Sequence, residues 1–411
     1  LLGRVMEEIE IPVGQTALYT CAERAHENDL EDRLFVDPLA KVLAGNRGHE
    51  LLESFHSVNG GVRKLPIAMS VVLRTTFLDQ ILSWCMEQGI TQVVIVAAGM
   101  DTRYSRFASS ALAQRTNLWE LDFPEVLNYK TRVIEAIEQV DIKNEFKSYQ
   151  KVGVDLTTAT WHETLIDSGY DSSTKSLWIV EGLFVYLKDE DIEKLIEKIG
   201  RLACPGSLFA GDWMNESYLH SSLTVGFRDV FSSFNSPFIN GKNHDEFVRL
   251  TKEKANIHSH LYSLGDYGSQ FTNRVPDNQV KVATQFPINN PQWQAIPRHF
   301  LFVGEKLSQS SDEPSETFCE QFPALPRDEE VCSQTCEDGQ AEEAVEDIVI
   351  TLVKEVLNVE DIANDSSLVT RGMDSLLFAI LANRIRSRMQ LDSSFLCLLF
   401  ECDSINEIVS A

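Results

Sequence analysis

Two groups of residues in this sequence could carry chemistry, and the more compact group lies close to the C-terminus. There, Asp374, Ser375 and Leu376 stand at the expected start of an amphipathic helix. A serine at a helix N-terminus lies beside unpaired backbone N–H groups and the positive end of the helix dipole. That position suits a serine that bears a phosphodiester. The same residue types also cap ordinary helices, so the motif needs support from the segment around it.

The second group consists of a glycine and several acidic residues, each following a strand-like segment. Strands are expected at 93–98, 118–122, 151–156, 176–181 and 208–212, with a closing edge strand at 299–303. Helical patterns lie between them, at about 69–88, 124–139, 161–168 and 189–202. This alternation predicts an α/β fold with an open, doubly wound Rossmann-like sheet.

In such a sheet, ligands bind beyond the carboxyl ends of the strands. That edge would hold Gly99, Asp101, Asp122, Asp155 and Glu181. The glycine allows the backbone to approach a ligand closely, and an acid after the second strand can accept hydrogen bonds from both hydroxyls of a ribose. The sequence has neither a Gly-x-Gly-x-x-Gly fingerprint nor a phosphate loop. The pattern therefore favours a nucleoside without phosphates, such as S-adenosylmethionine.

The segment around Ser375 has the dimensions of a small all-α bundle. Apolar residues recur at helical spacing over 342–357, and shorter apolar stretches follow to the C-terminus. About 70 residues is close to the lower limit for an independent core, and four short helices would satisfy it. Residues 342–411 resemble an acyl or peptidyl carrier domain. The resemblance implies 4'-phosphopantetheine covalently bound to Ser375, a phosphopantetheinyl transferase as partner, and acyl or peptidyl thioester substrates.

Composition limits the class of protein and the kinds of partner. The formal net charge of −26 argues against nucleic-acid and anionic-membrane binding, since both reward a basic surface. No signal peptide or apolar run of membrane-spanning length is visible, and the eight cysteines show no metal-ligand or disulfide framework. A reducing, cytoplasmic location is therefore expected. The chain begins with Leu1 rather than methionine, which suggests a piece of a longer polypeptide.

Much of the negative charge is concentrated between the two groups. Residues 305–347 contain about seven acidic residues for each basic one and few aliphatic residues. We therefore expect three parts: a large domain at 1–307, an acidic flexible linker at 308–341 and the carrier domain at 342–411. Such a linker could bring the carrier to the large domain, or it could serve solubility alone.

The large domain resembles the leucine carboxyl methyltransferase family over roughly 200 residues. The matching segments occur in family order and are Thr16–Leu18, Ala22–Ala25, Asp32–Ala40, Val71–Asp79, Ala98–Arg103, Glu120–Val126, Val154–Leu156 and Glu181–Leu187. This resemblance implies S-adenosylmethionine as cofactor.

The family's functional residues can be transferred to matching positions. Arg24 and Arg74 would face the methionine carboxylate, Gly99 would pass beside the methionine, and Glu181 would contact its amino group. Asp122 would hold the ribose, while Asp155 and Leu156 would frame the adenine; Asp101 belongs to the same edge. One position departs from the family, because Ala97 stands where glycine is usual. Its methyl group could crowd the cofactor.

The choice of acceptor decides what further chemistry is needed. A carboxylate needs no base, whereas a hydroxyl gains from one. Asp212, which follows the fifth strand, is a candidate, as are His162, His258 and His260, although each histidine is explained equally well by packing or surface exposure. Substrate choice is expected to depend on residues 214–297, where Phe227, Phe231, Phe234 and Phe238 could form an apolar lid or simply the buried side of an insertion.

Taken together, the sequence predicts an S-adenosylmethionine-dependent O-methyltransferase that acts on an intermediate tethered to its own carrier domain. The setting implied is a polyketide or non-ribosomal peptide assembly line, with upstream and downstream domains as partners. Two alternatives stay open. One is a carboxyl methyltransferase that acts on a protein or free acid. The other is a catalytically dead methyltransferase fold that serves as a scaffold for the carrier domain.

Overall fold

The computed structural model describes residues 12–58, 66–136, 146–221, 224–233, 235–268, 271, 288–289, 296–325, 345–357, 359, 361–368, 373, 381, 384–385, 402 and 404–410. Within these ranges, no helix combines the length and the apolar character needed to cross a membrane.

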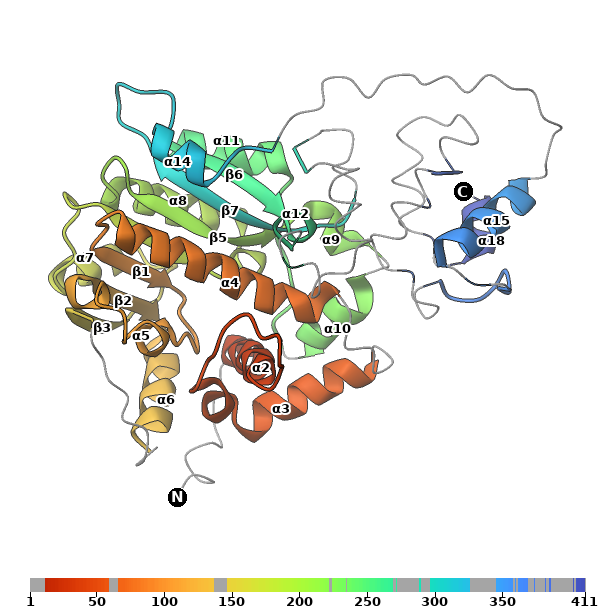
Figure 1. Ribbon diagram of the computed structural model, residues 1–411, viewed down its shortest axis with the longest axis horizontal. Coiled ribbons are helices and arrows are strands. Elements are labelled where there is room, and N and C mark those ends of the chain that lie inside the picture. The colour runs from red at the N-terminus through yellow and green to blue at the C-terminus, as the bar shows by residue number, and fades with distance from the viewer. Residues whose placement is uncertain are drawn as a thin grey trace.

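A seven-stranded sheet forms the centre of the large N-terminal part (Figure 1). Its order is β3-β2-β1-β4-β5-β7-β6, with bounds Gln92–Val96 (β1), Asn117–Asp122 (β2), Ser148–Gly153 (β3), Ser176–Val180 (β4), Leu208–Met214 (β5), Ile257–Ser263 (β6) and His299–Lys306 (β7). Strands β1 to β5 run parallel, whereas β7 pairs antiparallel with both β5 and β6. The central strands β1 and β4 are buried at every position, as expected for parallel strands covered on both faces. The predicted Rossmann-like α/β fold is confirmed.

Two strands differ from the sequence prediction. The strand expected to close the sheet, β7, is an interior strand, because β6 adds to its outer side. β6 itself was not predicted. Its only aliphatic residues are Ile257 and Leu261, among serines, histidines and a tyrosine, so it lacks the continuous apolar run of the central strands.

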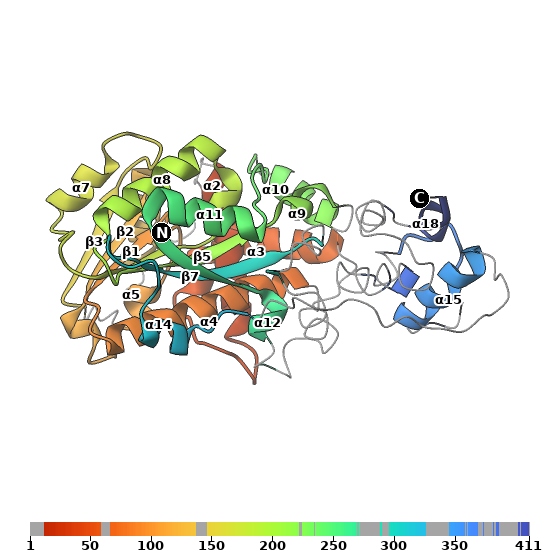
Figure 2. The ribbon, with the colours of Figure 1, turned by 90° about the horizontal axis from the view of Figure 1, so that it is seen from above.

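Helices cover both faces of the sheet and its carboxyl edge. Their bounds in the N-terminal part are Pro12–Glu27 (α2), Ala40–Val58 (α3), Pro66–Glu87 (α4), Arg103–Arg106 (α5), Pro124–Glu135 (α6), Trp161–Asp167 (α7), Asp189–Leu202 (α8), Glu216–His220 (α9), Val225–Ser233 (α10), His244–Ala255 (α11) and Leu264–Gly268 (α12), with 3-10 turns at Ala113–Arg115 and Phe184–Tyr186. α8 and α11 pack together on one face, and α4 crosses the other (Figure 2). α2 and α3 pack against each other, and residues of α2 lie over the carboxyl edge.

Local sequence signals explain where individual helices begin and end. α8 has three acidic residues in its first turn and Arg201 in its last turn, which matches both ends of the helix dipole. α11 begins with a capping box formed by Asn243 and Glu246. It ends at Asn256, which adopts the left-handed conformation typical of a helix C-terminus.

The packed N-terminal part extends beyond residue 307, where the acidic linker was expected to begin. Residues 308–325 include helix α14 (Glu316–Gln321), and Phe318 and Phe322 are buried in the main core. The Tyr262 hydroxyl donates a hydrogen bond to the Pro323 carbonyl at 3.0 Å. Two aromatic side chains thus anchor an otherwise acidic segment to the sheet. Residues 326–344 lie outside the described part of the chain.

The C-terminal part has a small apolar core of its own, and Ile296 belongs to the same cluster. Helix α15 (Val345–Leu357) packs against α18 (Ile405–Ser410). Around them, Ile362, Leu368 and Leu381 are buried. Helical residues and a compact apolar cluster are therefore present where a small bundle was predicted. Asp374, Ser375 and Leu376 lie outside the described residues.

Candidate active site

One pocket lies at the carboxyl edge of the parallel strands, beneath α2 and beside α4. All the residues proposed from the sequence for cofactor binding line it, together with the candidate base: Arg24, Arg74, Gly99, Asp101, Asp122, Asp155, Leu156, Glu181 and Asp212. They come from segments spread over nearly two hundred residues, which the parallel strand order brings to one edge.

The loops after β1 and β2 are joined by a single carboxylate. Asp122 accepts hydrogen bonds from the backbone N–H groups of Gly99, at 2.6 Å, and Phe123, at 2.7 Å. Burial raises the pKa of Asp122, although both N–H groups oppose this effect. Gly99 has φ of 49°, and a methyl group there would come within 3.1 Å of the Ala17 side chain. Glycine is therefore favoured here by both the backbone conformation and the limited space beside Ala17.

Ala97 adopts a conformation that normally favours glycine. Its φ is 52°, inside the left-handed region, and its side chain belongs to the pocket lining. This conformation is a physical reason for glycine to be favoured at this position, beyond the steric crowding expected from the sequence. The alanine costs backbone strain whether or not a ligand is bound.

The side of the pocket beside α4 carries charged groups of both signs. Arg74, on α4, lies between two carboxylates: its Nε is 3.0 Å from Glu181 Oε1, and its Nη1 is 3.3 Å from Asp212 Oδ2. Asp212 also accepts a hydrogen bond from the Gly182 backbone N–H at 2.7 Å. A positive and a negative group thus face the same space, which suits a ligand that carries both an ammonium and a carboxylate.

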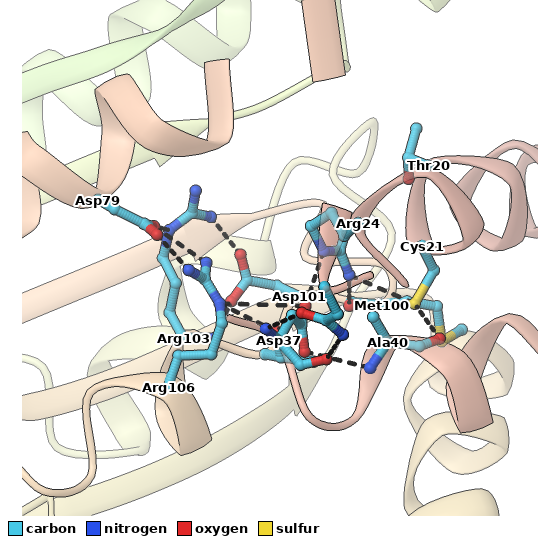
Figure 3. A network of polar contacts seen from close by, with 12 residues as sticks. Thr20, Cys21, Arg24, Asp37, Ala40, Asp79, Met100, Asp101, Arg103 and Arg106 are labelled. Carbon is cyan, nitrogen blue, oxygen red and sulfur yellow. Dashed lines mark hydrogen bonds and ion pairs between the residues drawn. The ribbon is translucent and has the colours of Figure 1, made fainter. Parts of the chain in front are cut away.

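Arg24 and Asp101 belong to a second set of contacts at the same edge (Figure 3). Arg24 pairs with Asp37 at 2.9 Å and donates to the Met100 carbonyl at 2.5 Å. Asp101 pairs with Arg103. The Nη1 atom of Arg103 also lies 2.9 Å from Glu181 Oε2. These contacts hold the charged groups in place and connect the loop after β1 to the loop after β4.

Asp155 and Leu156 lie at the opposite end of the pocket, after β3. Asp155 Oδ1 accepts hydrogen bonds from the backbone N–H of Thr157, at 2.9 Å, and from its hydroxyl, at 2.7 Å. Both residues are half-buried. The turn that they form gives the pocket a wall beside Asp122.

Sequence reasoning missed one titratable residue of this pocket, His299. It is the first residue of β7, is buried, and lines the pocket. Its Nε2 lies 2.7 Å from Asp212 Oδ2. The histidines considered from the sequence, His162 on α7 and His258 and His260 on β6, are absent from the lining. Because β7 runs antiparallel to β5, its start lies at the carboxyl end of β5, and this register was not visible in the sequence.

Aromatic side chains line the side of the pocket beside α10. Phe231 of α10 lies 5.6 Å from Tyr19 and 5.0 Å from Phe238, and Phe238 lies 5.4 Å from Tyr186, measured between ring centroids. All four line the pocket. Two of the four phenylalanines considered for a lid are therefore here, while the side chain of Phe227 and the whole of Phe234 lie outside the described residues.

Comparison with known proteins finds matches for both parts of the chain. Residues 17–200 match the model of the leucine carboxyl methyltransferase family, and residues 347–411 match that of the phosphopantetheine attachment site. A provisionally named S-adenosyl-L-methionine-dependent methyltransferase of Streptomyces coelicolor is 34% identical over 226 residues, which cover 54% of this chain and 72% of the relative. A similarly named protein of Parafrankia is 36% identical over 200 residues, 48% of this chain and 62% of the relative. Among solved structures, a DUF574 family protein of Streptomyces avermitilis aligns with a TM-score of 0.45 at 12% identity, over 70% of this chain and 97% of that one.

Proposed function

Because this chain belongs to the leucine carboxyl methyltransferase family of S-adenosylmethionine-dependent methyltransferases and contains a phosphopantetheine attachment domain, we propose that it methylates an intermediate held on that domain. The acceptor is a hydroxyl or enol oxygen of an acyl or peptidyl chain, and the product is a methyl ether. The observation that carries this proposal is the presence of both units in one chain, since tethering raises the effective concentration of the intermediate at the pocket.

The pocket residues fit the cofactor. Asp122, buried and fixed by two N–H groups, offers a carboxylate to the ribose hydroxyls. Arg74 and Glu181 offer opposite charges to the carboxylate and ammonium of the methionine moiety, with Arg24 as a further cation. Asp155 and Leu156 would frame the adenine edge, and Gly99 would permit close approach of the backbone. When bound, S-adenosylmethionine supplies a methyl group already activated by its sulfonium, so alignment of the acceptor is the main task of the protein.

The aromatic side of the pocket, beside α10, suits a mainly apolar acceptor. Phe231, Phe238 and Tyr186 present aromatic surface there, and Met214 extends it from β5. An acyl chain would lose apolar contact with water on entering, which favours binding. With an acceptor bound, this aromatic surface would also limit the access of water to the acceptor oxygen.

This function implies partners that the chain does not itself supply. A phosphopantetheinyl transferase must load Ser375, and an upstream enzyme must place the acyl or peptidyl group on the arm. We propose a polyketide or non-ribosomal peptide assembly line in the cytoplasm as the setting, with a downstream domain that takes the methylated chain.

The direct test is the mass of the intact protein. The chain is loaded with a hydroxyacyl-phosphopantetheine, incubated with S-adenosylmethionine, and analysed after ejection of the arm. We expect the mass of one methyl group on the ejected arm. Ser375→Ala should accept no arm, while its affinity for the cofactor, measured by calorimetry, stays unchanged.

Other outcomes would favour the alternatives. Methylation of a free acid or of a protein carboxylate, with the loaded arm left unmodified, would assign a carboxyl methyltransferase. Failure to bind S-adenosylmethionine would indicate a scaffold. The charged residues that surround the pocket argue against the scaffold, because a pocket without a ligand gains nothing from such an arrangement.

A further inference from the structure

His299 and Asp212 form a buried pair in the same pocket, and neither residue is assigned to the cofactor. We propose that His299 is the general base that removes the proton from the acceptor hydroxyl, with Asp212 as its positioning residue. This inference rests on the proposed function and adds its missing acid–base chemistry.

The geometry assigns different roles to the two nitrogens of the imidazole. Nε2 lies 2.7 Å from Asp212 Oδ2, so in neutral His299 the proton resides on Nε2 and is donated to the carboxylate. Nδ1 then has a free lone pair, and it makes no hydrogen bond to any described residue. It is therefore the atom that can accept a proton from a bound hydroxyl.

Asp212 is held so that it supports a cationic imidazole. Burial alone would raise its pKa, but the charge of Arg74 and the hydrogen bonds from His299 and Gly182 lower it to about 2. The carboxylate is thus ionised at every physiological pH. It stabilises the imidazolium that forms on proton transfer, while its own oxygens are already engaged by three donors.

The other acids of the pocket are less suited to act as bases. Asp155 lies at the opposite end of the pocket, after β3, and its Oδ1 accepts two hydrogen bonds from Thr157. Both oxygens of Asp122 accept backbone N–H groups, and both oxygens of Glu181 face arginines. Asp101 is paired with Arg103. Burial also raises the pKa of Tyr186, which keeps its hydroxyl protonated. His299 therefore remains as the side chain suited to proton removal among those described.

The sheet order places His299 on the acceptor side. Apart from Arg24 of α2 and Arg74 of α4, the residues assigned to the cofactor lie at the carboxyl ends of β3, β2, β1 and β4. Asp212 and His299 belong to the next two strands, β5 and β7. The aromatic wall of Phe231 and Phe238 lines the same pocket. A hydroxyl that enters over β5 and β7 would meet Nδ1 at the end of the pocket left free by the cofactor.

Methyl transfer forms one bond and breaks another. A lone pair of the acceptor oxygen forms the new O–CH3 bond. The S–CH3 bond breaks at the same time, and the electron pair of that bond stays on sulfur. The hydroxyl proton passes to His299 Nδ1, giving an imidazolium opposite Asp212. Water takes up this proton after the product leaves, and neutral His299 is restored.

The test compares His299→Gln with His258→Gln, a control in β6 away from the pocket. We expect His299→Gln to lower the rate of hydroxyl methylation by about 10²- to 10⁴-fold. Its affinity for S-adenosylmethionine and its loading at Ser375 should stay within about twofold of the wild type. His258→Gln should match the wild type in all three measurements. A normal rate in His299→Gln would overturn the inference while leaving the proposed function intact.

A second readout needs neither cofactor nor substrate. In protein labelled with ¹⁵N-histidine, the His299 signal, identified by its loss in His299→Gln, should show the proton on Nε2. Asp212→Asn should change this signature, since an amide oxygen supports the tautomer and the imidazolium more weakly. A proton on Nδ1 in the wild type would refute the assignment. If the wild type methylates only carboxylates, the proposed function and this inference fail together.

Discussion

Ala97 is a residue whose backbone conformation costs energy in the folded protein. With φ of 52°, its Cβ lies close to its own backbone, a cost of about 1–2 kcal/mol that glycine avoids. We therefore expect Ala97→Gly to stabilise the N-terminal domain by about 1 kcal/mol, although glycine also increases the entropy of the unfolded chain. The measurement is the melting temperature by calorimetry, which should rise.

Ala98 provides a matched control for this substitution. It is the adjacent alanine, it is buried where Ala97 is half-buried, and it is absent from the described residues with positive φ. Ala98→Gly should lower the melting temperature, because glycine there brings only the entropic cost and a lost contact. If both variants moved the melting temperature in the same direction, backbone strain at Ala97 would not explain the change seen in Ala97→Gly.

The identities of single residues in the pocket were predictable from the sequence, but their pairings were not. Glu181 and Asp122 follow strands that are apparent as apolar runs, so their place at the carboxyl edge follows from the fold class. The bridge from Arg74 to Asp212 joins residues 138 positions apart. His299 stands at the start of a strand, where a parallel sheet would place it at the wrong edge, and only the antiparallel register of β7 brings it to the pocket.

At the scale of elements, α6 is tied to the sheet by a buried ion pair. Lys130 Nζ lies 2.6 Å from Glu120 Oε2 of β2, and neither side chain is exposed. The Tyr149 hydroxyl of β3 donates to the same oxygen at 2.8 Å. Removal of the lysine would leave a buried carboxylate with one neutral donor. We expect Lys130→Met to reduce the free energy of unfolding at neutral pH by about 3–5 kcal/mol.

This loss should depend on pH in a defined direction. Burial raises the pKa of Glu120, against the opposing charge of Lys130, so the methionine variant should raise it further. The pKa of Glu120 is then higher in the folded variant than in the unfolded chain. The stability of the variant therefore falls as the pH rises from the unfolded pKa through the folded pKa. Lys130→Met should therefore approach wild-type stability on acidification. Arg201→Met, which breaks an exposed pair with Glu197, should cost less than about 0.5 kcal/mol at any pH.

Elements with a continuous apolar run could be predicted, and those with mixed faces could not. The four helices expected from their periodicity appear as α4, α6, α7 and α8, and the six expected strands all form. β6 was missed because an outer strand needs only partial burial, so its histidines and serines look like a loop. α14 was missed because two aromatic anchors in an acidic stretch give no periodic signal.

At the scale of the whole molecule, the chain combines a methyltransferase domain with a carrier domain, joined by an acidic segment. Residues 326–344 lie between the described N-terminal part and α15. We propose that they belong to a flexible linker; a flexible chain of that length spans roughly 25 Å root-mean-square, which corresponds to an effective concentration in the millimolar range. Under the proposed function, the carrier should thus deliver its own intermediate in preference to that of another molecule.

This preference can be measured by complementation between two full-length variants. Ser375→Ala keeps the methyltransferase domain but cannot be loaded, whereas Asp122→Ala keeps the carrier but should bind the cofactor poorly. For the wild type, we expect a methylation rate that is independent of protein concentration at micromolar levels. The mixture should react at a rate proportional to the concentration of Ser375→Ala, at least about tenfold more slowly in this range, because the reaction is then bimolecular. Equal rates in the two experiments would show that methylation occurs between molecules, and that the acidic segment serves some purpose other than delivery.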